Sequence, residues 1–263
     1  MTLSIQTITE ILQSNAALIK CPGLIYGKMG LVVYFFHYSK YSNDRSYAKL
    51  AIKLIEGIQD NITEDSQINY SRGLSGIGSG IEYLAQQGFL NINTDEVLKD
   101  IDAQVFRSIV YAEFIDSSLF NGLTGLGRYL MFRVTNSKST DDKVSTLTNK
   151  MLIIHVVDKL EKMLIRGDEM TEDSLKFLIE VRKLNIYPTK INKIIDNYRG
   201  CSCVVDYQSD ESNNHSNIEI IRSNSNKWES SKSNFSLYNG YVGLGLSILT
   251  QLDCKHQTWR TLL

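Results

Sequence analysis

The chain contains little proline and little cysteine, and it carries almost no net charge. Two prolines among 263 residues leave room for many helices, because proline breaks helix interiors. Four cysteines do not make a disulfide framework in a chain of this length. A formal net charge of −1 gives no basic surface for nucleic acid. We therefore expect a helical protein with no nucleic-acid partner.

Long hydrophobic runs are absent as well. The longest apolar stretch, residues 31–36, is far too short to span a bilayer. The first 20 residues have neither the basic start nor the long apolar run of a secretory signal. We expect no transmembrane segment and a cytoplasmic location. With 43% hydrophobic residues, the chain can still bury a sizeable core.

Glycine is concentrated in four copies of one motif, G-x-x-G. The segments 26–31, 72–77, 121–126 and 239–244 align without gaps, and the last three continue to a third glycine. The last two also share the longer frame S-L-[FY]-N-G. We interpret the copies as internal repeats. The motif glycines are Gly27, Gly30, Gly73, Gly76, Gly78, Gly122, Gly125, Gly127, Gly240, Gly243 and Gly245.

Each motif precedes an apolar run of helical length, and amphipathic stretches at 47–62 and 95–114 separate the first three copies. The first glycines are 46 and then 49 residues apart, which fits two helices and two loops. The gap from Gly122 to Gly240 is 118 residues and should hold at least one degenerate repeat. Helical periodicity there covers 146–164, 171–183 and 189–198.

The glycines have a structural interpretation. The first glycine would make the entry turn of a helix, and the second would let a neighbouring helix pack closely. The Asn or Ser before the motif would cap the first turn. A phosphate cradle is disfavoured, because the dinucleotide fingerprint has its glycines in another order, after a strand.

One long segment, residues 207–235, is dominated by Ser, Asn and charge. We expect it to be an exposed polar loop, either disordered or a tolerated surface insertion, within a single domain spanning 1–263.

The motif segments resemble those of the lanthionine synthetase C (LanC) family. The resemblance rests on IYGKMGLVVYFFHYSKY, GLSGIGSGIEYL, SLFNGLTGLGRYLMF and SLYNGYVGLGLSIL. It covers about 20–134 and 236–263 and is weak between them. It implies an all-α fold, an α/α toroid of inner and outer helices, here incomplete with about five helical-hairpin repeats.

The resemblance also implies an activity and a metal. LanC enzymes join cysteine thiols to dehydrated Ser or Thr residues of precursor peptides, using zinc held by two cysteines and one histidine. Zinc favours the reactive thiolate. The family's ligands lie in W-C-x-G and C-H-G motifs, and this sequence has neither. We therefore assign no catalytic residue, no metal ligand and no cofactor.

Other titratable residues are weaker candidates. Cys201 and Cys203 with His215, or Cys254 with His256, could replace the metal site, but ordinary thiols are favoured. We expect three further residues to be structural: His37 packed or exposed, His155 beside the core, and Glu82 at the surface or in helix packing.

The sequence predicts a LanC-like protein in the maturation or handling of a ribosomally synthesised peptide. It would be a binding or scaffolding component that contacts a peptide or a modifying enzyme. The alternatives are a cyclase-type or glycosidase-type toroid enzyme with a rearranged site, and a remnant that supports another subunit in an oligomer. The motif segments contain no Asp or Glu, which argues against the glycosidase. The expected peptide-contact residues are Tyr26, Lys28, Arg72, Phe120, Tyr238 and Tyr241.

Overall fold

The computed structural model describes residues 4–63, 66–114, 116–135, 144–168, 170–201 and 235–263. Within these ranges every regular element is a helix. The chain divides into two compact units: unit 1 comprises residues 1–65 and 206–263, and unit 2 comprises residues 66–205. The expected all-α fold is confirmed. The predicted polar loop at 207–235 lies outside the described residues except for Phe235.

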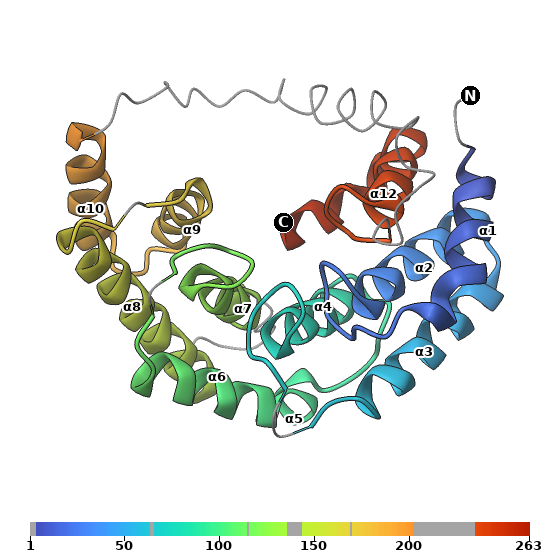
Figure 1. The fold of residues 1–263 in the computed structure, drawn as a ribbon, viewed down its shortest axis with the longest axis horizontal. Coiled ribbons are helices and arrows are strands. Elements are labelled where there is room, and N and C mark those ends of the chain that lie inside the picture. The colour runs from blue at the N-terminus through green and yellow to red at the C-terminus, as the bar shows by residue number, and fades with distance from the viewer. Residues whose placement is uncertain (1–3, 64–65, 115, 136–143, 169, 202–234) are drawn as a thin grey trace. The chain divides into compact units, whose positions relative to one another are not determined.

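Unit 1 is built around two apolar helices. They are α2 (Lys28–Ser42) and α12 (Tyr241–Leu252), which pack against each other. In Figure 1, α2 lies between α12 and α3 (Arg45–Gln59). The remaining elements are α1 (Ile5–Asn15), the short η1 (Ala16–Leu18) and the 3₁₀ segment η3 (Cys254–Leu262). Both α1 and η3 pack on α12.

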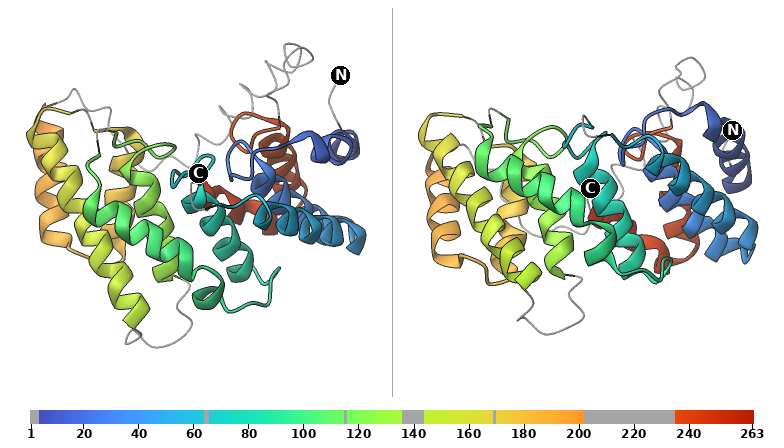
Figure 2. Two further views of the ribbon diagram at one scale, coloured as in Figure 1. Left: turned by 60° about the horizontal axis from the view of Figure 1, so that its bottom comes forward. Right: turned by 90° about the horizontal axis from the view of Figure 1, so that it is seen from below.

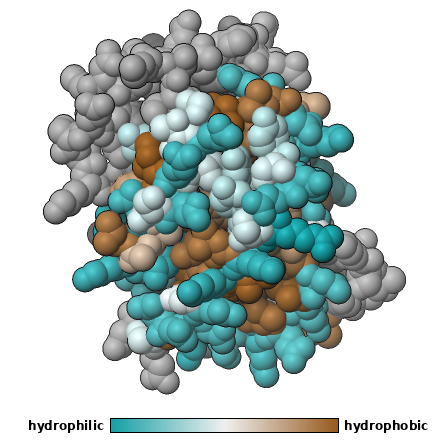
Figure 3. All heavy atoms as spheres, turned by 90° about the vertical axis from the view of Figure 1, so that its right-hand side faces the viewer, coloured by the Kyte–Doolittle hydropathy of each residue, from teal (hydrophilic) through white to brown (hydrophobic). Residues whose placement is uncertain are grey.

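Burial separates the two kinds of helix in unit 1. In α2 every residue from Met29 to Ser39 is buried, as expected of a helix that is apolar all round. In α3, by contrast, Ala51, Leu54 and Ile58 form a single buried face. Figure 3 shows the side of unit 1 formed by α1 and α3, where hydrophilic side chains surround smaller hydrophobic areas.

Unit 2 repeats this arrangement. In Figure 1, α4 (Leu74–Gln86), α7 (Leu123–Thr135) and α9 (Glu172–Lys183) are covered by α6 (Lys99–Tyr111), α8 (Val144–Ile165) and α10 (Pro188–Cys201). The one-turn helix α5 (Thr94–Val97) precedes α6. Contacts join α4 to α6, α7 to α8 and α9 to α10, and Figure 2 shows α8 alongside α7 and α6.

The predicted helices are found within a few residues of their expected bounds. Helices α8, α9 and α10 occupy the gap between the third and fourth glycine motifs, where the sequence predicted a degenerate repeat. The stretch predicted at 95–114 is divided, because Leu98 leaves the helical conformation between α5 and α6. The 3₁₀ segment η3 was not predicted.

Candidate functional site

The first glycine of each motif lies beneath the loop that precedes its helix. A Cβ atom at Gly27, Gly73, Gly122 or Gly240 would approach within 3 Å of a backbone oxygen of that loop. The φ angles of Gly27, Gly73 and Gly240 are all negative, between −145° and −107°. These glycines are therefore needed for a close backbone approach and not for a left-handed turn.

The loops also satisfy the free N–H groups at the helix starts. In the first three copies, the residue after the first glycine donates its backbone N–H to a carbonyl seven positions earlier. The bonds run from Lys28 to Cys21 (2.8 Å), from Leu74 to Gln67 (2.8 Å) and from Leu123 to Asp116 (2.9 Å). The predicted Asn or Ser caps are wrong for α4 and α12, where a glycine is the N-cap and no side-chain cap hydrogen bond is made. Helix α2, which no Asn or Ser precedes, also begins after a glycine N-cap. In α2 and α4, a carbonyl of the preceding loop accepts the hydrogen bond from the helix start instead.

The second and third glycines have different roles. A Cβ at Gly30 would lie 2.6 Å from the Leu24 carbonyl oxygen, and Gly125 and Gly243 likewise face loop carbonyls. The expectation that the second glycine admits a neighbouring helix is therefore wrong for these copies. Close helix contacts occur at the third glycine, whose missing side chain leaves room for an aromatic ring. The pairs are Gly78 with Tyr129, Gly127 with Phe177, and Gly245 with Tyr34.

The glycine loops are joined to one another within each unit. In unit 1 the Leu237 N–H donates to the Ile25 carbonyl at 2.7 Å. In unit 2 the Ser71 N–H donates to the Phe120 carbonyl at 3.0 Å. The acceptor lies two residues before the first glycine in both cases. Each unit therefore presents a pair of linked loops at the start of its glycine-motif helices.

The linked loops of unit 1 carry two exposed tyrosines. Ile25 and Leu237 are buried, whereas the adjoining Tyr26 and Tyr238 are 40% and 45% exposed. Tyr241 is half-buried, with its ring 6.1 Å from that of Phe235. The predicted residues Tyr26, Tyr238 and Tyr241 are therefore brought to one end of unit 1.

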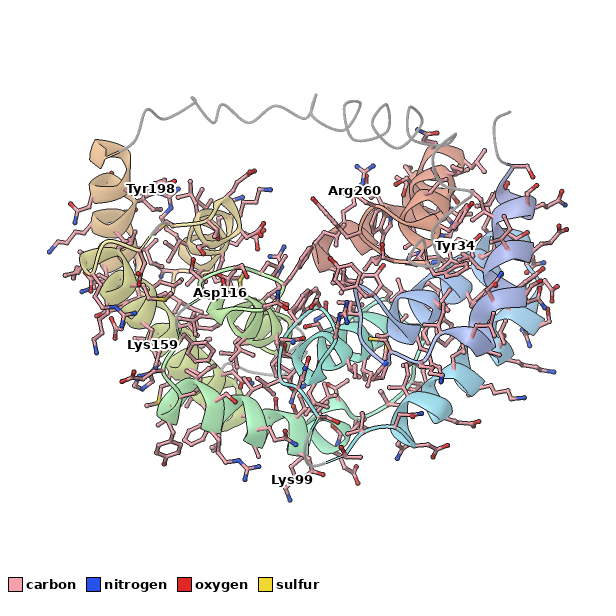
Figure 4. All side chains as sticks on the ribbon, viewed as in Figure 1. Tyr34, Lys99, Asp116, Lys159, Tyr198 and Arg260 are labelled. Atoms are coloured by element: carbon pink, nitrogen blue, oxygen red, sulfur yellow. The ribbon has the colours of Figure 1, made fainter. Side chains whose placement is uncertain are left out.

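The other predicted contact residues are placed differently. The Lys28 amine lies beside the last turn of α3, because a Cβ at Gly57 would be 3.8 Å from Nζ. Arg72 is exposed and Phe120 half-buried on the linked loops of unit 2. Asp116 also belongs to these loops and was missed by the motif pattern (Figure 4). Its carboxylate accepts hydrogen bonds from the backbone and hydroxyl of Ser118, so it holds the loop in shape.

The zinc site that the family implies does not fit the described residues. Cys21 is half-buried and Cys254 is exposed, and both are free thiols. Among the described side chains no group of three or more from His, Cys, Asp and Glu is arranged so that it could hold a metal ion. Cys203 and His215 lie outside the described residues, as does the side chain of Cys201. Cys254 does not join His256 in a metal cluster within the described part of the chain.

Two histidines that the sequence analysis did not connect lie in contact inside unit 1. His37 of α2 and His256 of η3 are both 2% exposed, and their Nδ1 atoms are 2.9 Å apart. Burial, followed by His256 and Lys40, lowers the pKa of His37 to about 3. Burial also lowers the pKa of His256. Their separation by 219 residues left no signal in the sequence. His155, expected beside the core, is exposed on α8 instead.

Glu82 belongs to a buried ionic cluster in unit 2. The Arg133 guanidinium of α7 donates to Glu82 at 2.7 Å, to Asp95 at 2.8 Å and to Asp102 at 2.9 Å. The Tyr129 hydroxyl donates to Asp102 at 2.5 Å. Burial raises the pKa of Glu82, and Arg133 partly opposes this. The cluster joins α4, α5, α6 and α7, so Glu82 serves helix packing, one of its two expected roles.

The comparisons agree with the repeat pattern. The family model described as lanthionine synthetase C-like protein matches residues 21–178, more than half of the chain. No curated protein matches the sequence. In the part of the chain that the structure describes, no helix has the length and apolar character to cross a membrane. The matched region contains the first three glycine motifs, and the chain belongs to the lanthionine synthetase C-like family.

Proposed function

We propose that this protein binds a ribosomally synthesised, lanthipeptide-like peptide in the cytoplasm and does not cyclise it. The observation that carries the proposal is the pair of exposed tyrosines, Tyr26 and Tyr238, on the linked loops of unit 1. Family membership supports a connection with peptides of this class.

The linked loops are well suited to bind a flexible ligand. Exposed aromatic side chains give a large contact area at low conformational cost, and they are frequent anchors of interfaces. The backbone beneath the tyrosines is fixed, since Ile25 and Leu237 are buried on either side of a 2.7 Å hydrogen bond. A rigid backbone reduces the ordering cost of binding.

The sequence supports the non-catalytic part of the proposal. The full chain contains neither of the motifs in which the family's zinc ligands lie. Without a metal, a peptide thiol keeps a pKa near 8.5 and is mostly protonated at neutral pH.

A binding measurement tests the proposal. The probe is a fluorescein-labelled lanthipeptide precursor peptide, and fluorescence anisotropy gives its Kd. Replacing Tyr26 or Tyr238 by alanine should weaken binding by about 5- to 30-fold, since an aromatic anchor contributes about 1–2 kcal/mol.

A matched control uses a tyrosine outside the loops. Tyr111, at the end of α6, is 77% exposed, and Tyr111→Ala should leave the Kd unchanged. Failure of the unsubstituted protein to bind the precursor would overturn the proposal. Equal losses in Tyr26→Ala and Tyr111→Ala would show that the linked loops are not the contact surface.

A further inference from the structure

The contact between His37 and His256 joins two segments that are distant in sequence. His37 lies in the second half of α2, and His256 lies in the first turn of η3. The two rings meet edge to face, with centroids 5.2 Å apart and planes inclined at 69°. Packing of η3 is otherwise centred on α12, where the Trp259 indole donates to the Thr250 hydroxyl at 3.1 Å.

The geometry of this pair requires at least one nitrogen without a proton. At 2.9 Å one Nδ1 donates to the other, and a ring that is protonated on both nitrogens has no lone pair with which to accept. A first added proton would leave the hydrogen bond intact but would place a cation in a buried site. A second would remove the hydrogen bond and place two cations in contact. Both steps are costly when each side chain is 2% exposed.

Charged groups of both signs surround the pair. Lys40 of α2 and Lys255 of η3 disfavour the cationic form, and Asp253, the N-cap of η3, favours it. Helix α12 contributes no charged residue. The charged residues of α3 (Arg45, Lys49, Lys53 and Glu56) and Glu10 of α1 are exposed to solvent. Burial, which is the largest cause at both rings, therefore keeps the neutral pair favoured.

We propose that His37 and His256 form a proton-sensitive latch, which holds η3 against α2 when both rings are neutral and releases it when they are protonated. The latch does not depend on the proposed peptide function, since it uses residues of α2 and η3 away from the glycine loops. It would make the position of η3 respond to acidification within unit 1.

The direction of the pH dependence follows from proton uptake. A released histidine has a pKa near 6.5, whereas the pKa of each latched ring is lower. The released form therefore binds more protons, and the latch is most stable above pH 6.5. It weakens as the pH falls below 6.5, and for His37 the effect continues toward about pH 3. At pH 4.5, His37 alone can shift the equilibrium up to about 100-fold.

Trp259 provides a reporter for the test. It is buried in η3, and replacing the second tryptophan by Trp228→Phe leaves Trp259 as the single tryptophan. Between pH 7.5 and 4.5 the emission of Trp259 should shift to longer wavelength, with a midpoint below 6.5, while far-UV circular dichroism retains the helical signal. An unchanged emission, or loss of helix at the same midpoint, would overturn the latch.

Two variants identify the titrating groups. In His37→Gln/His256→Gln the amides can still hydrogen-bond but cannot take up a proton in this range, so the red shift should disappear. His155→Gln, which replaces an exposed histidine on α8, should keep it. The same red shift in the double variant would exclude the histidine pair as the cause.

If the double variant does not fold, an NMR titration of the histidines in the unsubstituted protein still tests the proposal. In NMR spectra, the Cε1–H resonances of two of the four histidines, His37 and His256, should titrate below pH 6.5. The finding that all four titrate near 6.5 would contradict the proposal.

Discussion

At the scale of single residues, the three glycines of a motif act on different neighbours. The first glycine of every motif, and Gly30, Gly125 and Gly243 among the second glycines, accommodate loop carbonyls. The third glycine, present in three motifs, accommodates an aromatic ring of a neighbouring helix. Tyr34 shows how tightly such a ring is held. Its hydroxyl is 2.6 Å from that of Thr9, and its ring faces Gly245 between α1 and α12 (Figure 4). The contact leaves no room for a methyl group.

Gly245→Ala should destabilise unit 1. Its Cβ would lie closer than 3 Å to Tyr34 and 3.2 Å from Ile8 Cγ2, and overpacking of this kind costs about 1–3 kcal/mol. Guanidinium unfolding should therefore give a lower midpoint. Gly57→Ala in α3 is the control, because it has space for a methyl group and should raise stability by about 0.5–1 kcal/mol. A stabilised Gly245→Ala protein would disprove the packing role.

The sequence indicated which glycines matter but not what each contacts. The spacing of Gly27, Gly73 and Gly122 predicted three helix starts, which the structure confirms. The ring opposite each third glycine could not be predicted, because it lies on another helix. The same holds for His37 and His256, since nothing in a local pattern relates residues 219 positions apart.

At the scale of elements, the packing of α9 shows how a repeat can lose its motif. Phe177 places its ring over Gly127, as Tyr129 does over Gly78 one helix earlier. The start of α9 has a side-chain cap, because Thr171 accepts from the Ser174 N–H in place of a loop carbonyl. The hydrophobic periodicity therefore predicted that α9 is a helix. Because α9 has no glycine motif, the sequence could not predict that it packs on α7 as α7 packs on α4.

The ionic cluster around Arg133 gives a prediction for α7. Arg133→Met should cost about 3–5 kcal/mol in unfolding free energy, because it leaves Glu82 buried without its cation. The same change at Arg128, whose partner Glu180 is partly exposed, should cost about 1 kcal/mol or less. Thermal unfolding of the two variants gives the comparison, and equal losses would contradict a special role for the buried cluster.

At the scale of the whole molecule, the glycine repeats and the family match lead to the same conclusion. The chain keeps the LanC-like helices, while its sequence lacks the motifs in which the family carries zinc ligands. The sequence was enough to predict the family, because each glycine motif is a contiguous segment. Which loops are linked could not be predicted, since the hydrogen bond from Leu237 to Ile25 joins opposite ends of the sequence.

Counting peptide thiols by mass spectrometry tests the account most directly. A dehydrated precursor peptide is incubated with this protein and then alkylated with N-ethylmaleimide. Ring closure adds a thiol across a dehydroamino acid without changing the mass, so each ring formed removes one alkylation adduct. We predict that every thiol remains alkylatable, as in a control without protein. A progressive loss of adducts would show that the protein is a cyclase and would contradict its proposed non-catalytic role.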